Sequence, residues 1–334
     1  MAESTELKAK DFSNGSDVKW CPGCGCFPIL KGVQRAMAEI GVDKSQQMVI
    51  SGIGCSSRFP YYMSTFGFHT LHGRAPTIAV GAKLANPSLG AWIITGDGDC
   101  LSIGGNHFIH LMRRNLDINM LLFNNEIYGL TKGQASPTSK TGTVSKTTPL
   151  GSVDTPMQAL PMALSAGASF AARVLDSDIK TMVEVFKQAE AHKGTAFIEI
   201  LFNCVTFSDG IHDLYKKKDT KTVTTIKLTH GQPLLYGAEN EKGFVLDGTK
   251  LKVIDVTDTN KAEVLVFDDK DVNLSYLLSK LEYPEFPIPL GILKKVERPT
   301  YEALYAAQVD DAIEKWGEGD LDKTLRGDDF WETK

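Results

Sequence analysis

The chain has 334 residues, a length that suits two domains of ~150 residues each. Hydrophobic residues make up 42% and charged residues 23%, so the chain can bury a sizeable core, which excludes a disordered or fibrous protein. The net charge is −5 without a basic block, which argues against nucleic-acid binding because that binding depends on neutralising phosphates.

The predicted location follows from hydropathy. No run approaches the ~20 apolar residues that span a bilayer, so no membrane association is expected. The first residues, MAESTELKAKDF, lack the apolar core of a secretory signal, and we expect a cytoplasmic protein. Its six cysteines are not expected to form disulfides, because the cytosol keeps thiols reduced.

Residues 1–20 are polar and are expected to form an N-terminal arm. Apolar residues at helical spacing predict helices over 28–42, 75–84, 106–114, 157–166 and 179–192. Short apolar runs predict strands over 48–50, 92–94, 118–123, 169–174 and 196–202. This alternation indicates an α/β fold, a doubly wound and mostly parallel sheet, which we place in residues 21–210.

Two further segments differ from this pattern. Residues 132–152 are rich in Ser, Thr, Lys, Gly and Pro, and a loop of that length is usually functional or disordered. Residues 211–334 contain short β-like runs at 224–226, 252–254 and 264–266, two weak helices and a charged end. We interpret 211–334 as an extension that covers the site or a partner subunit.

Four polar or thiol side chains follow predicted strands: Cys55, Asp97, Asn125 and Cys204. Ligands of doubly wound sheets bind beyond the carboxyl ends of the strands. We therefore expect these four residues to lie together at one edge of the sheet.

The cysteines are candidate metal ligands. Cys21 and Cys24 form a CxxC, whereas the other four are dispersed: Cys26, Cys55, Cys100 and Cys204. Structural zinc, an iron–sulfur cluster, and redox or inert thiols all remain open for a single CxxC. A zinc ribbon normally needs a second CxxC, so lone cysteines at strand ends fit a cluster somewhat better.

The second motif is the sequence GDGD at 96–99, followed by Asn124 and Asn125. Glycines let the backbone approach a diphosphate, and carboxylate and amide oxygens suit Mg²⁺. A glycine turn plus an Asn-rich loop is the structural alternative for either half alone. The chain has no GxGxxG or GxxxxGK[ST] motif, which disfavours NAD, FAD and ATP.

This second motif resembles the thiamine diphosphate motif of thiamine-dependent enzymes, in which GDGD is followed by a spacer of about 25 residues and then NN. Further segments resemble β subunits of 2-oxoacid:ferredoxin oxidoreductases: WCPGCG at 20–25, GIGCSS at 52–57, HTLHGR at 69–74, NCVTF at 203–207 and ERPTY at 297–301. The main resemblance runs from about residue 18 to residue 210, which implies a thiamine diphosphate-binding fold.

The resemblance also implies the ligands. One 4Fe-4S cluster would be held by Cys21, Cys24, Cys55 and Cys204, with Cys26 and Cys100 outside the pattern. Mg²⁺ would be held by Asp97, Asn125 and the carbonyl of Ile127. Thiamine diphosphate would be lined by Ile53, Gly54, Ser56, His72, Gly98, Asp99, Gly129 and Leu130. A histidine satisfied within a turn is the alternative for His72.

The implied reaction is reversible oxidative decarboxylation of a 2-oxoacid, in which coenzyme A takes the acyl group and ferredoxin the electrons. Arg58 and Lys132 flank the expected site and would bind substrate carboxylates. Lys132 stands where pyruvate-type relatives often carry glycine, so we favour 2-oxoglutarate, with pyruvate or a broad range of 2-oxoacids as the alternative. A solvated loop residue is the alternative for Lys132.

Thiamine enzymes also use a carboxylate that contacts the aminopyrimidine ring. The resemblance to this family implies that the partner chain supplies this carboxylate. We therefore expect an α subunit in an αβ or α2β2 assembly, and an isolated chain that is inactive. Two rival functions are a non-catalytic electron-transfer subunit and a non-redox thiamine decarboxylase with structural zinc on the cysteines.

Overall fold

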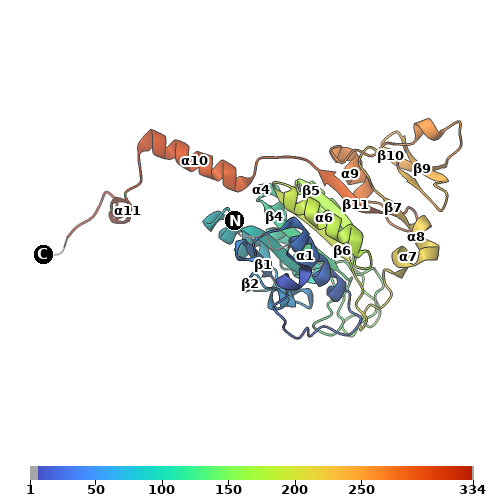
Figure 1. Ribbon diagram of the computed structural model, residues 1–334, viewed down its shortest axis with the longest axis horizontal. Coiled ribbons are helices and arrows are strands. Elements are labelled where there is room, and N and C mark those ends of the chain that lie inside the picture. Colours follow the sequence, from blue (N-terminus) through green and yellow to red (C-terminus); the bar gives the residue numbers. More distant parts are fainter. Residues whose placement is uncertain (1–6, 333–334) are drawn as a thin grey trace.

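The computed structural model describes residues 7–332 and contains one large sheet (Figure 1). Its strands are β1 (Gln47–Ser51), β2 (Phe66–His69), β3 (Gly90–Gly96), β4 (Ile118–Asn124), β5 (Phe170–Leu175), β6 (Thr195–Leu201), β7 (Thr225–Lys227) and β11 (Ile288–Lys295). Their order is β2-β1-β3-β4-β6-β5-β11-β7. Strands β1 to β6 are parallel, and β11 runs antiparallel to β5 and parallel to β7.

Helices cover both faces of this sheet. One face carries α1 (Cys26–Ile40) and α6 (Ile179–Ala191), and the other carries α2 (Ala75–Ala85), α4 (Gly105–Arg114), α5 (Ala159–Ser165) and α9 (Val272–Ser279). Successive residues of β3 enter opposite cores, because Trp92 packs with Phe186 of α6 while Ile93 belongs to the cluster beneath α4. The expected doubly wound α/β fold is confirmed.

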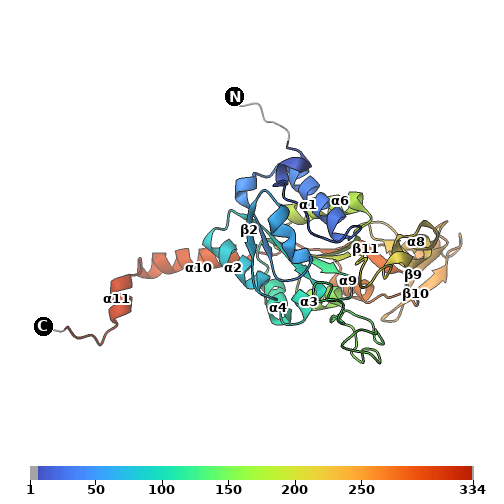
Figure 2. The same ribbon diagram turned by 90° about the horizontal axis from the view of Figure 1, so that it is seen from below.

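The remaining elements are short or peripheral. They are α3 (Asp97–Leu101), α7 (Asp213–Lys216), α8 (Lys218–Thr224), α10 (Tyr301–Trp316), α11 (Leu321–Arg326), and the 3-10 turns η1 (Ala9–Phe12), η2 (Lys44–Gln46), η3 (Ser56–Tyr62) and η4 (Lys261–Glu263). A separate antiparallel sheet has the order β10-β9-β8, from β8 (Leu235–Tyr236), β9 (Lys242–Asp247) and β10 (Lys250–Asp255). Both views show α10 and α11 projecting away from the body, at the end opposite this small sheet (Figure 2).

The structure differs from the sequence prediction mainly after residue 210. Strands β7 and β11 come from the expected extension, yet they complete the main sheet, so a domain boundary at residue 210 would cut through that sheet. Residues 264–266, expected as a strand, form only an isolated bridge between Val266 and Pro233. Within residues 7–20 of the expected arm, Phe12 is fully buried in the cluster that includes α1. No helix in residues 7–332 combines the length and apolarity needed to cross a bilayer.

Candidate active site

Two cavities open at the carboxyl edge of the parallel strands and share a wall. The first, of about 170 Å³, is lined by loops that follow β1, β3 and β4. The second, of about 220 Å³, is lined by the segment before α1 and by the loops after β1, β4 and β6. The shared residues are Cys55, Asn125, Gly129, Leu130 and Phe202. The predicted convergence of the strand ends is therefore confirmed.

The first cavity contains several oxygen atoms that can coordinate a metal ion, and we call it the oxygen-donor cavity. One terminal atom of the Asn125 amide lies 3.2 Å from Oδ1 of Asp97 and 2.9 Å from the carbonyl oxygen of Ile127. Both neighbours are acceptors, so the amide nitrogen donates to both in the metal-free protein. With the amide turned, its oxygen would lie 3.2 Å and 2.9 Å from the other two oxygens, close to the spacing of adjacent ligands in an octahedral Mg²⁺ site, which is about 2.9 Å for Mg–O bonds of about 2.0–2.1 Å. The three residues fit this cation.

The Asp97 carboxylate is held by the polar loop of residues 132–152. Its Oδ2 accepts hydrogen bonds from Ser136 Oγ at 2.5 Å and Thr138 Oγ1 at 2.7 Å. Burial raises the pKa of Asp97 to about 6, and these two hydroxyls act in the opposite direction. The sequence prediction missed both hydroxyl residues, because nothing in a Ser/Thr-rich loop indicates which members turn inward.

Asp99 lines the first cavity and also holds the loops around it. Its carboxylate accepts from the backbone of Ile53 at 2.9 Å and Gly73 at 2.7 Å, from Thr95 Oγ1 at 2.6 Å, and pairs with His72 Nδ1 at 2.7 Å. These partners occupy both carboxylate oxygens, so Asp99 lines the cavity while fixing its loops. His72 keeps Nε2 as its ring nitrogen available to a ligand, because Nδ1 faces Asp99.

The glycines of the first cavity allow close packing. A Cβ on Gly98 would lie 2.1 Å from the ring of Tyr128, whose hydroxyl donates to the Gly98 carbonyl at 3.2 Å. Gly54 has a φ of +132°, a backbone angle that residues with a side chain rarely adopt. The other expected cofactor residues also line this cavity: Ile53, Ser56, His72, Asp99, Gly129 and Leu130. Tyr128 also lines it and was not predicted.

The second cavity brings the four expected cysteines together: Cys21, Cys24, Cys55 and Cys204. All are free thiols. Burial raises the pKa of Cys55 to about 11, with further increases from Cys24, Cys204 and Cys21. Facing thiolates repel one another, so the four would be deprotonated together only with a cationic metal between them.

The spacing of the sulfurs discriminates between metals. Among the described residues, no three cysteine sulfurs lie within 4.8 Å of one another. Ligand sulfurs of a tetrahedral zinc ion are about 3.8 Å apart for Zn–S bonds of about 2.3 Å. The cysteine set is therefore too open for a single zinc ion and leaves room for a larger group.

The two remaining cysteines lie outside this set. Cys26 is fully buried at the start of α1 and hydrogen bonds Cys24, which lowers the pKa of the Cys24 thiol. Cys100 lies in the core cluster on the other face of the sheet. Neither lines the second cavity.

The two expected substrate residues lie away from the oxygen-donor cavity. Arg58 lines the cysteine cavity instead, where its Nε donates to Tyr62 Oη at 3.1 Å. Lys132 is exposed, lines neither cavity and adopts a φ of +80°. Their contact with substrate stays a prediction.

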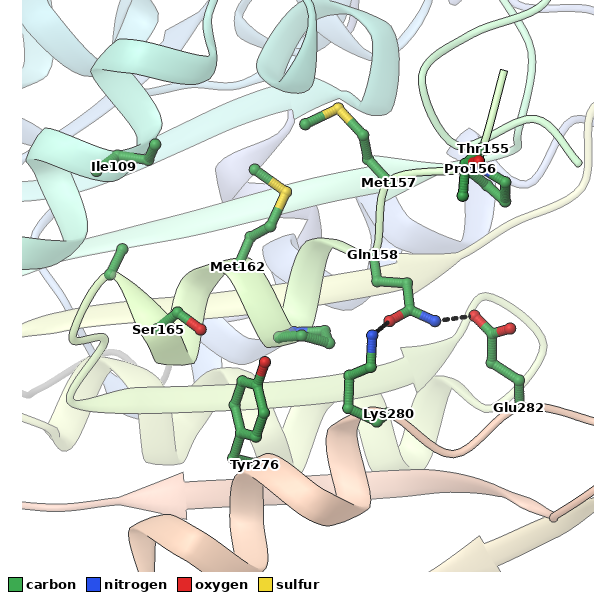
Figure 3. Close-up of a pocket in the computed structure, with 12 residues that line it drawn as sticks. Ile109, Thr155, Pro156, Met157, Gln158, Met162, Ser165, Tyr276, Lys280 and Glu282 are labelled. Atoms are coloured by element: carbon green, nitrogen blue, oxygen red, sulfur yellow. Dashed lines mark hydrogen bonds between the residues drawn. The ribbon is translucent and has the colours of Figure 1, made fainter. Parts of the chain in front are cut away.

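A separate cavity of about 770 Å³ lies between α4, α5 and α9 (Figure 3). In it the amide of Gln158 accepts a hydrogen bond from Lys280 and donates one to Glu282, so it bridges these two charged groups. This cavity contains none of the expected site residues.

Comparison with known protein families identifies the class of protein. Residues 52–200 match the family model of the thiamine pyrophosphate enzyme C-terminal TPP-binding domain. This match includes Asp97, Asn125 and the loop that carries Cys55.

Comparison over the whole chain is more specific. The chain is 45% identical to the 2-oxoglutarate oxidoreductase subunit KorB of Mycobacterium tuberculosis over 97% of its own length and 88% of that protein. It is 41% identical to the 2-oxoglutarate synthase subunit KorB of Methanocaldococcus jannaschii over 56% of its length and 70% of that protein. The chain belongs to the family of 2-oxoacid:ferredoxin oxidoreductase β subunits.

A solved structure agrees with this assignment. The 2-oxoglutarate:ferredoxin oxidoreductase from Magnetococcus marinus, with 2-oxoglutarate, coenzyme A and succinyl-CoA bound, superposes with a TM-score of 0.77 at 33% identity. The superposition covers 97% of this chain and 96% of the matched chain. The likeness therefore includes the region after residue 210 as well as the thiamine diphosphate-binding domain.

Proposed function

We propose that this chain is the β subunit of a cytoplasmic 2-oxoglutarate:ferredoxin oxidoreductase. The complete enzyme would convert 2-oxoglutarate and coenzyme A to succinyl-CoA and CO2, reversibly, with ferredoxin as electron acceptor. One observation carries the proposal: the oxygen-donor cavity and the four-cysteine cavity share a wall. A group that releases electrons and a group that accepts them would then be neighbours.

The oxygen-donor cavity suits Mg²⁺ and a diphosphate. Asp97, Asn125 and the Ile127 carbonyl would hold the ion, and the glycine-rich backbone would receive the diphosphate. Thiamine diphosphate, when bound, supplies a nucleophilic carbon and an electron sink for decarboxylation. The chain's own task is to keep Asp97 ionised beside the metal, which Ser136 and Thr138 support by donating to its Oδ2.

The four-cysteine cavity suits a 4Fe-4S cluster. Its sulfurs are spread too widely for one zinc ion, and mutual repulsion of their thiolates is relieved by iron. Cys24 belongs to the CxxC turn, and the loops after β1 and β6 bring Cys55 and Cys204 to it.

An α subunit is required to complete the site. Among the described residues that line the oxygen-donor cavity, the carboxylates are Asp97 and Asp99, and both are already engaged. Neither is free to act against the aminopyrimidine ring. A partner would supply that group, so the isolated chain should bind thiamine diphosphate weakly and be inactive.

The choice of 2-oxoglutarate rests on the named relatives and on two cations: Arg58, which lines the cysteine cavity, and Lys132, which follows the lining residue Thr131. The similar M. marinus enzyme contains 2-oxoglutarate and succinyl-CoA. Arg58 and Lys132 supply cations that a substrate with two carboxylates would need, once the partner closes the cleft. Pyruvate, which has one carboxylate, gains less from the second cation.

The test is anaerobic coproduction of the chain with its α subunit, followed by metal and thiamine analysis and a screen of 2-oxoacids. We expect a brown complex that contains iron, sulfide and thiamine diphosphate and reduces ferredoxin fastest with 2-oxoglutarate. A colourless complex with zinc would refute the cluster. A complex neither stabilised nor activated by thiamine diphosphate would favour an electron-transfer subunit, and full turnover by the single chain would refute the need for a partner.

A further inference from the structure

Asp176 and Lys216 form a buried ion pair beside the cysteine cavity. Asp176 directly follows β5, and Lys216 ends α7, so the pair connects the main sheet to the region after residue 210. Lys216 Nζ lies 2.6 Å from Asp176 Oδ1, and the two side chains are 15% and 6% exposed. Neither residue lines the cavities of the proposed reaction.

The second oxygen of Asp176 contacts both loops that carry cluster ligands. Oδ2 accepts a hydrogen bond from the backbone of Asn203 at 2.9 Å, and Asn203 directly precedes Cys204. The same oxygen lies so close to Gly25, the residue after Cys24, that a Cβ there would approach it to 2.2 Å. Gly25 in turn donates its N–H to the Asn203 carbonyl at 3.1 Å. One carboxylate thus lies at the joint between the CxxC turn and the Cys204 loop.

Among the lysines of this segment, Lys216 is the one that contacts Asp176. Neighbouring lysines have other partners, because Lys217 pairs with Asp213 at 3.0 Å and Lys221 lies 3.8 Å from Asp178. Lys216 is therefore the cation that compensates Asp176.

We propose that Asp176 and Lys216 are a positioning pair that holds the two cysteine-bearing loops in register and sets the reduction potential of the cluster between them. This inference rests on the proposed function, because it requires the cluster. One-electron reduction adds a negative charge to the cluster, which the Asp176 carboxylate opposes and the Lys216 ammonium favours. A buried ion pair is weak evidence of a stabilising role by itself, so its placement at this joint is what indicates its purpose.

The experiment uses the anaerobic complex with the α subunit and measures the cluster potential by a redox titration monitored by EPR. Asp176→Asn, whose amide oxygen can still accept from Asn203, should raise the potential. Lys216→Met leaves Asp176 uncompensated and should lower it. The double variant should return close to the wild type. Lys217→Met is the matched control, since this neighbouring lysine pairs outward with Asp213, and it should leave the potential unchanged.

Opposite shifts separate an electrostatic role from simple damage to the fold. Shifts in the same direction, or none, would overturn the inference. If a single variant fails to fold, Asp176→Glu keeps the charge but inserts a methylene where Gly25 leaves no space, so the EPR line shape should change. A wild-type line shape and potential in that variant would also overturn it. A wild-type complex without iron and sulfide would instead refute the proposed function.

Discussion

Replacing Asp97 with asparagine should stabilise the metal-free protein while removing its response to Mg²⁺. Asp97 is 2% exposed, and within residues 7–332 its carboxylate is paired with hydroxyl groups rather than with a Lys or Arg side chain. The introduced amide oxygen can take the place of Oδ1 and keep the hydrogen bond from the Asn125 amide nitrogen. Its amide nitrogen would then replace Oδ2 and donate to the hydroxyl oxygens of Ser136 and Thr138, and Thr138 still donates its own proton to Asn124 Oδ1.

The magnitude follows from the shifted pKa. Burial raises the pKa of Asp97 from 3.8 to about 6, so the folded state binds this proton more tightly than the unfolded state. Stability from this group is therefore present below about pH 4 and is lost as the pH rises through about 6. At about 1.4 kcal/mol per pKa unit, the loss is about 3 kcal/mol at pH 8 and about half of that at pH 5. Asp97→Asn should recover these amounts.

Urea unfolding in EDTA at pH 5 and pH 8 measures this difference, and thermal shifts with Mg²⁺ and thiamine diphosphate measure the lost response. Asp99→Asn is the matched control, because an amide nitrogen cannot accept the hydrogen bonds that Asp99 receives on both oxygens. That variant should lose stability at both pH values. The reasoning fails if Asp97→Asn is destabilised at pH 8, or if its gain is equal at pH 5 and pH 8.

Two further variants probe the shared wall and the loop around the metal site. In Gly129→Ala the added methyl would lie 3.6 Å and 3.7 Å from the sulfurs of Cys55 and Cys204, an ordinary contact, so we expect little change in unfolding free energy but a loss of iron and sulfide from the complex. An unchanged iron content would contradict a cluster at this position. Burial raises the pKa of Glu126 to about 7, so Glu126→Gln should stabilise the metal-free chain at pH 8 and have less effect at pH 5, as measured by urea unfolding. An equal change in unfolding free energy at pH 5 and pH 8 would contradict a raised pKa of Glu126.

The fold was predictable where burial imposes a pattern. Strand β4 is buried along its whole length and is largely apolar between Asn119 and Asn124, as expected of a central parallel strand. The edge strand β2 is exposed throughout, so neither periodicity nor hydropathy indicates it. Strand β11 reaches the sheet from more than a hundred residues beyond β5, with Pro289 and Gly291 in its middle. Pairing over that distance depends on tertiary packing, which a local pattern does not contain.

The site residues also divide into those that the sequence pattern predicts and those that it does not. Asp97 and Asn125 were predictable because the sheet topology fixes where strands end, and side chains at those ends must meet. Ser136 and Thr138 reach Asp97 from 39 and 41 residues away through an irregular loop. Asp176 was not predicted either, because a single aspartate after a strand is common. Such supporting residues are defined by contacts between loops, which no spacing in the sequence encodes.

Lys132 offers a test of substrate choice. Its φ of +80° lies in the left-handed region, which costs a non-glycine residue about 1 kcal/mol. A lysine kept there in spite of strain is typical of a residue retained for function. Lys132→Gly should therefore raise the unfolding free energy by about 0.5–1 kcal/mol, whereas Lys132→Ala should not, because alanine shares the strain.

Both Lys132 variants should lower the ratio of 2-oxoglutarate to pyruvate turnover in the complete complex, since both remove the cation that would bind the distal carboxylate. The alanine variant controls for backbone flexibility, and the glycine variant controls for residual strain. An unchanged ratio in both would place the selection of 2-oxoglutarate elsewhere, in Arg58 or in the α subunit. A drop only in Lys132→Gly would show that loop conformation, rather than charge, selects the substrate.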